Sequence, residues 1–206
     1  MTRRFLALGD SYTIGEGVEA GERWPDQLIR GLRDRGMTID APHIVAKTGW
    51  TTEELASAIE RSALRRPFDI VSLLVGVNDQ YRGLGVAEYE ARFSPLLGRA
   101  LELAASDPRR LIVVSIPDWG ATPFAARDPR GRAAIATEID RFNVVTRRLA
   151  VAAQAAYVDI TRISRQAAHD SSLLAADGLH PSAAMYAQWV DLLLPAALAV
   201  LDARSP

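Results

Sequence analysis

The sequence contains no cysteine, and this absence excludes several kinds of chemistry. Without a thiol there is no disulfide framework, no thiolate zinc site, no iron–sulfur cluster and no cysteine nucleophile. Histidine is also scarce, because His43, His169 and His180 are the only three in the chain. A histidine-rich metal cluster is therefore excluded, and any reaction that needs an imidazole must use one of these three side chains.

The chain also lacks a large net charge and long apolar segments. Its 24 basic and 25 acidic residues give a net charge of −1, so no overall field attracts nucleic acid or an anionic membrane. No segment reaches the roughly 18 consecutive apolar residues of a spanning helix. Only four apolar residues separate Arg4 from Gly9, which is too few for a signal peptide. We therefore expect a cytoplasmic protein with no integral membrane segment.

With 206 residues, 49% of them hydrophobic, the chain suits one domain that covers residues 1–206. Short apolar runs alternate with longer amphipathic stretches. The runs predict strands at 5–8, 39–46, 69–75, 110–116 and 156–160, and the stretches predict helices at 24–35, 51–64, 86–105, 133–155 and 182–202. Pro95 should kink or split the helix at 86–105. This alternation favours βαβ units, and so an α/β fold with a parallel sheet covered on both faces.

Polar residues follow several of these strands at the point where each strand ends. Residues 9–13 follow the first strand, 48–51 the second and 76–79 the third, while 177–181 precede the last helix. In open α/β sheets, ligands bind outside the carboxyl ends of the strands. We therefore expect these four loops to share one edge of the sheet.

The four loops contain the parts that acyl transfer by a serine requires. A hydroxyl needs a base to take its proton, and histidine is suited to that task near neutral pH. A carboxylate must orient the imidazole, and hydrogen-bond donors must face the developing oxyanion. Ser11, His180 and Asp177 can supply the first three groups, and Gly49 and Asn78 can supply donors.

The spacing of Asp177 and His180 is informative in itself. Asp-Gly is a turn dipeptide, so it can fold the carboxylate back toward an imidazole three residues further on. Pro181 restrains the residue that precedes it. Both groups can thus be held in one short loop.

Taken together, these residues resemble the SGNH hydrolases, also called the GDSL esterase/lipase family. The matching blocks, which span residues 9 to 181, are Gly9-Asp10-Ser11, Gly49, Gly76-Val77-Asn78-Asp79 and Asp177-Gly178-Leu179-His180. The resemblance implies a flavodoxin-like three-layer α/β/α sandwich with a five-stranded parallel sheet. It also implies Ser11 as nucleophile, with the backbone N–H groups of Ser11 and Gly49 and the Asn78 side chain as oxyanion donors.

The resemblance implies a serine esterase that hydrolyses small or single-chain acyl esters through an acyl-enzyme, with no cofactor and no metal. Within the same family, a lysophospholipase, a thioesterase and a carbohydrate acetylesterase are alternatives. Outside it, a metal-dependent phosphoesterase would use a set of acidic and amide side chains with one histidine, namely Asp10, Asn78, Asp79, Asp177 and His180. A binding domain without activity would have no need of the complete Ser, His and Asp set.

Aromatic residues in the predicted loops are candidates for a substrate pocket, although they also suit packing of the loops. They are Tyr12, Trp50, Tyr81, Trp119 and Phe124. We expect core positions for Trp24 and Trp189 because both lie in predicted helices.

Other polar residues have simpler interpretations. Asp10 and Asp79 are expected to brace their own turns. The basic run Arg127, Arg130 and Arg132 suits a solvated loop or a contact with an anionic substrate. His43 and His169 are expected to be structural or exposed, which leaves His180 for chemistry.

Overall fold

Five parallel strands form the centre of the protein, which we describe from a computed structural model covering residues 2–64 and 67–202. The strands are β1 (Phe5–Gly9), β2 (His43–Ala46), β3 (Ile70–Leu74), β4 (Leu111–Val114) and β5 (Ala156–Val158). They pair in the order β2-β1-β3-β4-β5, each parallel to its neighbours. Strands β1, β3 and β4 are buried throughout, as expected of central strands covered on both faces. The predicted α/β fold with a five-stranded parallel sheet is confirmed.

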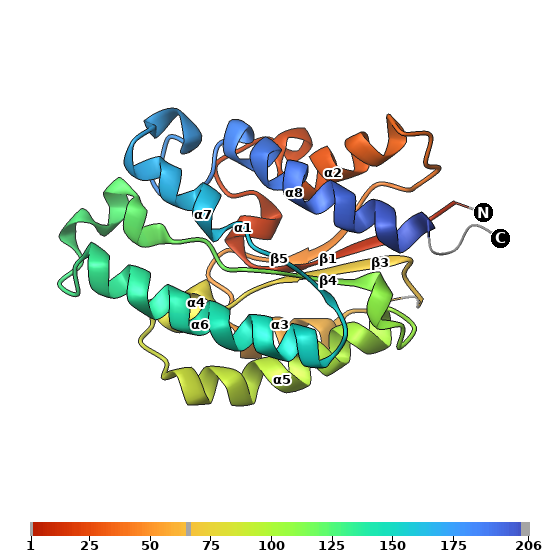
Figure 1. Ribbon diagram of the computed structural model, residues 1–206, viewed down its shortest axis with the longest axis horizontal. Coiled ribbons are helices and arrows are strands. Elements are labelled where there is room, and N and C mark those ends of the chain that lie inside the picture. The colour runs from red at the N-terminus through yellow and green to blue at the C-terminus, as the bar shows by residue number, and fades with distance from the viewer. Residues whose placement is uncertain (1, 65–66, 203–206) are drawn as a thin grey trace.

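Helices cover both faces of this sheet and complete three layers (Figure 1). They are α1 (Ser11–Ile14), α2 (Trp24–Arg33), α3 (Thr52–Arg61), α4 (Val77–Tyr81), α5 (Val86–Leu103), α6 (Arg132–Ala152), α7 (Thr161–Ser164) and α8 (Ala183–Asp202). Figure 1 shows α2 and α8 on one face, and α3, α5 and α6 on the other. Trp24 of α2 packs 6.1 Å from the ring of Phe5, and Trp189 of α8 is fully buried. Both tryptophans are core residues, as predicted.

Helix α8 is long and apolar enough to cross a membrane by length and composition alone. Half of that apolar stretch is buried inside the structure, where the helix lies along α2. Core helices of soluble proteins meet the same criterion, so a spanning role does not follow.

Several predicted boundaries differ from the structure, and two of the differences involve a proline. β2 begins at His43 rather than at residue 39, because Pro42 has no N–H to donate and Ile39 makes only an isolated bridge to Arg3. Helix α5 is not split at Pro95. Pro95 is exposed there, so water can bond to the carbonyl that loses its partner, while Phe93 and Leu96 are buried in the core.

The order of the strands determines where a site can form. The chain leaves β1 for β2 on one side and continues to β3 on the other, which makes the edge beyond β1 and β3 the switch point of the sheet. In Figure 1, α1 and α4 gather at this same edge. The loops that the sequence places after β1, β2 and β3 therefore converge there.

Candidate active site

Ser11 is held in a tight turn between β1 and α1. Asp10 caps the helix, since its Oδ1 accepts a hydrogen bond from the N–H of Tyr12 at 3.0 Å. Gly9 permits the turn because a Cβ at that position would lie 2.2 Å from Thr13 Oγ1 and 2.5 Å from the carbonyl oxygen of Leu74. The sequence thus fixes Ser11 at the first residue of α1, directly beyond the carboxyl end of β1.

Asp10 is fully buried, and the structural role expected for it agrees with its hydrogen bond to the backbone. Its second carboxyl oxygen has no partner among the described residues. Burial, reinforced by the charge of Asp79, outweighs the bond from Tyr12 and raises the pKa of Asp10 to about 8. Asp10 is therefore a neutral group at neutral pH.

His180 is held by Asp177 in the loop before α8, as the spacing predicts. Asp177 Oδ1 accepts the backbone N–H groups of Leu179 and His180, both at 2.9 Å, and Oδ2 lies 2.6 Å from His180 Nδ1. Gly178 takes a positive φ of 67°, which lets the loop fold back. Partial burial opposes the charge on Asp177, but the bonds from His180 and Leu179 outweigh it and lower the pKa of this carboxyl.

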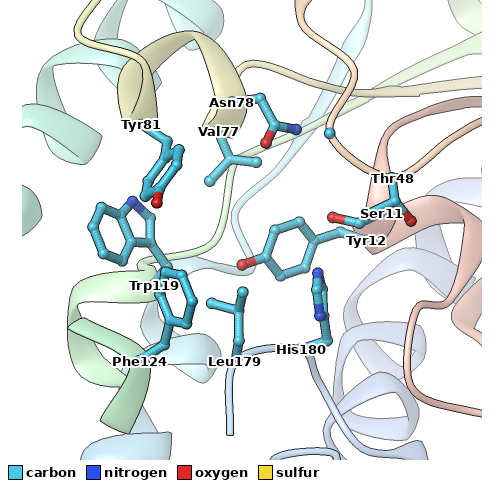
Figure 2. Close-up of a pocket in the computed structure, with 11 residues that line it drawn as sticks. Ser11, Tyr12, Thr48, Val77, Asn78, Tyr81, Trp119, Phe124, Leu179 and His180 are labelled. Atoms are coloured by element: carbon cyan, nitrogen blue, oxygen red, sulfur yellow. The ribbon is translucent and has the colours of Figure 1, made fainter. Parts of the chain in front are cut away.

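The imidazole faces Ser11 across one cavity. Because Nδ1 is occupied by Asp177, Nε2 is the ring nitrogen left for the cavity. Figure 2 shows the His180 ring extending toward Ser11, with the ring of Tyr12 beside it. The rings of His180 and Tyr12 are 5.3 Å apart, and Tyr12 is backed by Trp189 at 6.3 Å. The ring packing thus fixes the plane of the imidazole as well as its hydrogen bond.

Hydrogen-bond donors lie on the opposite side of Ser11 from this loop. One N–H of the Asn78 amide donates to the carbonyl of Trp50 at 2.9 Å, which orients the side chain and leaves a second N–H. Figure 2 shows this amide directed across the cavity toward the side of Ser11 and Thr48. Gly49 also lines the cavity, in a backbone conformation with φ of 84° that favours glycine. Within residues 2–64 and 67–202, the backbone N–H groups of Ser11 and Gly49 have no acceptor.

Asp79 braces the Asn78 helix, as expected from the sequence. Its two oxygens accept the N–H of Thr52 at 2.9 Å and the hydroxyl of Thr52 at 2.7 Å. Burial raises the pKa of Asp79 against these two bonds. The helix with Asn78 is thereby tied to the start of α3. At that start, Thr51 and Glu54 form a reciprocal capping box.

The cavity that these groups surround has a volume of about 150 Å³ and a mostly apolar wall. It is lined by Ser11, Tyr12, Thr48, Gly49, Val77, Asn78, Tyr81, Trp119, Phe124, Leu179 and His180. Figure 2 shows three aromatic residues from this set gathered opposite Ser11, namely Tyr81, Trp119 and Phe124. Trp119 is anchored because its indole N–H donates to Gln80 at 2.7 Å.

Four of the five predicted pocket aromatics therefore line this cavity, and Trp50 does not. Trp50 packs against the hydrophobic core, and only its carbonyl serves the site, through Asn78. Val77 and Leu179 were not predicted as lining residues. Both lie inside the motifs Gly-Val-Asn-Asp and Asp-Gly-Leu-His. Their position beside the motif residues is the sequence signal that could have identified them.

The remaining charged candidates lie outside the cavity. Arg130 pairs with Asp128 at 2.9 Å and covers the ring of Trp119, with its guanidinium carbon 5.2 Å from the ring centroid, so it supports the wall. Arg127 lines a second, open cavity of about 710 Å³ that shares Tyr81 and Phe124 with the first.

His43 and His169 are exposed residues that do not line the cavity. In the part of the chain that the structure describes, no three His, Asp or Glu side chains are grouped to hold a metal ion. Lys47, the only lysine of the chain, is exposed at the end of β2 beside Thr48 and Gly49.

Comparison with known proteins places this chain among ester hydrolases. Residues 7–188 match the GDSL-like lipase/acylhydrolase family, and the chain belongs to that family. It is therefore a hydrolase that acts on ester bonds, with the α/β fold of the SGNH hydrolases. Comparison of the sequence with curated proteins gave no match.

Solved structures show the same fold at low sequence identity. TesA has a TM-score of 0.73 at 18% identity, over 96% of this chain and 99% of the other. A lipase/acylhydrolase from Enterococcus faecalis has a TM-score of 0.74 at 22% identity, with 94% of each chain covered. The W215I variant of Axe2, an acetyl xylan esterase from Geobacillus stearothermophilus, has a TM-score of 0.73 at 19% identity, over 95% of this chain and 94% of the other.

Proposed function

We propose that the protein is a serine esterase that hydrolyses carboxylic esters of small or single-chain acyl groups. The observation that carries this proposal is the hydrogen-bonded pair of Asp177 and His180, 2.6 Å apart, whose imidazole faces Ser11 in the same cavity. An ionised carboxylate on Nδ1 fixes the tautomer in which Nε2 accepts a proton. The lowered pKa of Asp177 keeps that carboxylate ionised.

The proposed reaction proceeds in two steps on this geometry. Ser11 Oγ attacks the ester carbonyl while His180 takes the hydroxyl proton, and the resulting tetrahedral oxyanion is bound by the N–H groups of Ser11 and Gly49 and the Asn78 amide. His180 then gives its proton to the leaving alcohol, which yields an acyl-enzyme on Ser11. Water activated by the same imidazole attacks this acyl group and releases the acid. No cofactor takes part, the substrate is a small molecule rather than a nucleic acid, and the site of action is the cytoplasm.

The test is hydrolysis of p-nitrophenyl acetate, butanoate and hexanoate by the wild type and by Ser11→Ala. We expect Ser11→Ala and His180→Gln each to lower kcat by at least about 10⁴-fold, because the serine and its base act as one unit. His169→Gln is the matched control, since His169 is exposed and does not line the cavity, and its rate should equal that of the wild type. Equal rates for the wild type and Ser11→Ala would contradict the proposal.

A carbohydrate acetylesterase is the second candidate, and the open cavity beside the site is the observation that favours it. Tyr81 and Phe124 line that cavity and are 46% and 47% exposed, next to the charged groups of Arg127 and Asp128. Aromatic faces with polar neighbours suit the stacking and hydrogen bonding of a sugar. Release of acetate from an acetylated xylo-oligosaccharide, with a higher kcat/KM than for p-nitrophenyl acetate, would favour this candidate.

A further inference from the structure

The hydroxyl group of Tyr12 lies at the apolar end of the active-site cavity and has no hydrogen-bond partner among the described residues. The side chain is only 3% exposed, yet it lines the cavity. Figure 2 shows the hydroxyl pointing away from Ser11, toward Trp119 and Leu179. It therefore faces the space that a group attached to Ser11 would occupy.

Four other polar side chains of the cavity each have a partner for one of their polar groups. The indole N–H of Trp119 is bound to Gln80, the hydroxyl of Thr48 to Glu16, and the Asn78 amide to the carbonyl of Trp50. His180 is bound to Asp177. The neighbours of the Tyr12 hydroxyl in the cavity wall, such as Val77 and Leu179, are apolar. At this end of the cavity, a polar atom of a ligand would thus meet Tyr12.

The ring that carries this hydroxyl has little freedom to turn away. It packs between His180 at 5.3 Å and Trp189 at 6.3 Å. A second cavity of about 10 Å³ shares Tyr12, Trp119 and Leu179 with the larger cavity and is also lined by Asp118, Thr122 and Ser164. A space of that size holds about one water molecule and no acyl chain, so a ligand can approach the hydroxyl only from the larger cavity.

The hydroxyl can act as a donor throughout the working range of pH, because burial raises the pKa of Tyr12. Once a ligand excludes water from the cavity, a donor that finds no acceptor is unfavourable, whereas an acceptor in the ligand satisfies it. A site of this kind therefore discriminates against a ligand that offers a methylene at the same place.

We propose that Tyr12 selects acyl groups that carry a hydrogen-bond acceptor, such as an ether, hydroxyl or keto oxygen, along the chain. This inference rests on the proposed esterase reaction and adds the chemical class of the acyl group. The acyl group is assigned to this cavity because it stays bonded to Ser11 while the alcohol departs. A cavity of about 150 Å³ has room for a group about the size of benzene, and it shares Tyr81 and Phe124 with the larger open cavity.

The experiment compares esters in which one methylene is replaced by oxygen. The three pairs of p-nitrophenyl esters are methoxyacetate with butanoate, 3-methoxypropanoate with pentanoate, and 4-methoxybutanoate with hexanoate. For each pair, the ratio of kcat/KM for the ether ester to kcat/KM for the alkyl ester is measured in the wild type and in Tyr12→Phe. The intrinsic reactivity of each ester cancels when the two proteins are compared. Phenylalanine retains the ring that packs on His180 and Trp189.

We expect the ratio to fall about five- to tenfold in Tyr12→Phe for at least one pair, the size of effect typical of one lost hydrogen bond between uncharged groups. Tyr157→Phe is the matched control, because Tyr157 does not line the cavity and its hydroxyl donates to the carbonyl of Asn143. Its ratios should equal those of the wild type. A merely structural hydroxyl would change both members of each pair equally.

Ratios that are the same in the wild type and Tyr12→Phe for all three pairs would overturn the assignment of Tyr12. Failure of the esterase proposal is detected separately, by Ser11→Ala. If that variant hydrolysed the alkyl esters at the wild-type rate, the reaction itself would be wrongly assigned, whatever the ratios showed.

Discussion

Two aspartates, in the loops that carry Ser11 and His180, illustrate how environment separates the roles of identical side chains. Asp10, in the turn before Ser11, is fully buried with one backbone partner and has its pKa raised to about 8. Asp177 has a side chain that is 39% exposed, accepts three hydrogen bonds and has its pKa lowered. Only an ionised carboxylate can stabilise the imidazolium that forms on His180. Asp10, being neutral, can shape the turn but cannot take that role.

Within this comparison, the largest loss of activity is expected when the charge of Asp177 is removed. We expect Asp177→Asn to lower kcat by about 10⁴-fold, because an amide on Nδ1 favours the wrong imidazole tautomer. Steady-state hydrolysis of p-nitrophenyl butanoate measures the effect. Asp170→Asn is the control, since Asp170 lies in the preceding turn, where it caps the N–H of Ser172. An Asp177→Asn variant with the rate of Asp170→Asn would show that the charge is not needed.

Asn78 belongs to neither aspartate's loop, and its removal provides an intermediate effect for comparison. We expect Asn78→Ala to lower kcat by about 10²- to 10³-fold, the loss typical of one oxyanion donor. KM should change less, because the oxyanion exists only in the transition state. Asn78→Asp should be at least as impaired, since a carboxylate repels the oxyanion. A change below about threefold in Asn78→Ala would remove Asn78 from this role.

The smallest effect on activity is expected at Asp10. Asparagine can accept the same N–H of Tyr12, so Asp10→Asn should lose less than about tenfold in kcat. Its effect should instead appear in the pH dependence of stability. Between pH 4 and pH 8 the folded protein holds a proton on Asp10 that the unfolded chain has released, so the raised pKa makes wild-type stability fall as the pH rises.

Urea unfolding at pH 5, 6.5 and 8 measures this dependence. The free energy of unfolding of the wild type should fall more steeply than that of Asp10→Asn, with a difference in slope of up to about 1.4 kcal/mol per pH unit. Parallel slopes for the two proteins would mean that Asp10 is ionised in the folded state, and the contrast with Asp177 would disappear.

Parts of this arrangement could be predicted from the sequence because they depend on local spacing. Asp177 and His180 lie three residues apart around a glycine, so their contact needs only one turn of chain. The convergence of Ser11 and Asn78 follows from the order of the strands and the rule for the carboxyl edge of a parallel sheet.

Other features depend on packing between distant segments and could not be predicted. The sequence does not show that Trp50 packs against the core while Val77 lines the cavity, because both residues follow strand ends at the same edge of the sheet. The burial that raises the pKa of Asp10 is likewise a property of the assembled layers. The segment after β4 was predicted as a loop, yet it contains 3₁₀ turns at Trp119–Ala121 and Pro123–Arg127, and Asp118 there binds the distant Arg165 at 2.8 Å.

The single lysine has a consequence for handling the protein. Lys47 is exposed at the end of β2, next to two residues that line the cavity. The other residues with strongly basic side chains are all arginines. Amine-reactive dyes and aldehyde-activated supports would therefore find just one side chain to modify, at the rim of the reaction site. A fluorophore attached there would report on occupancy of the cavity, whereas immobilisation through the same amine would place the support against its entrance.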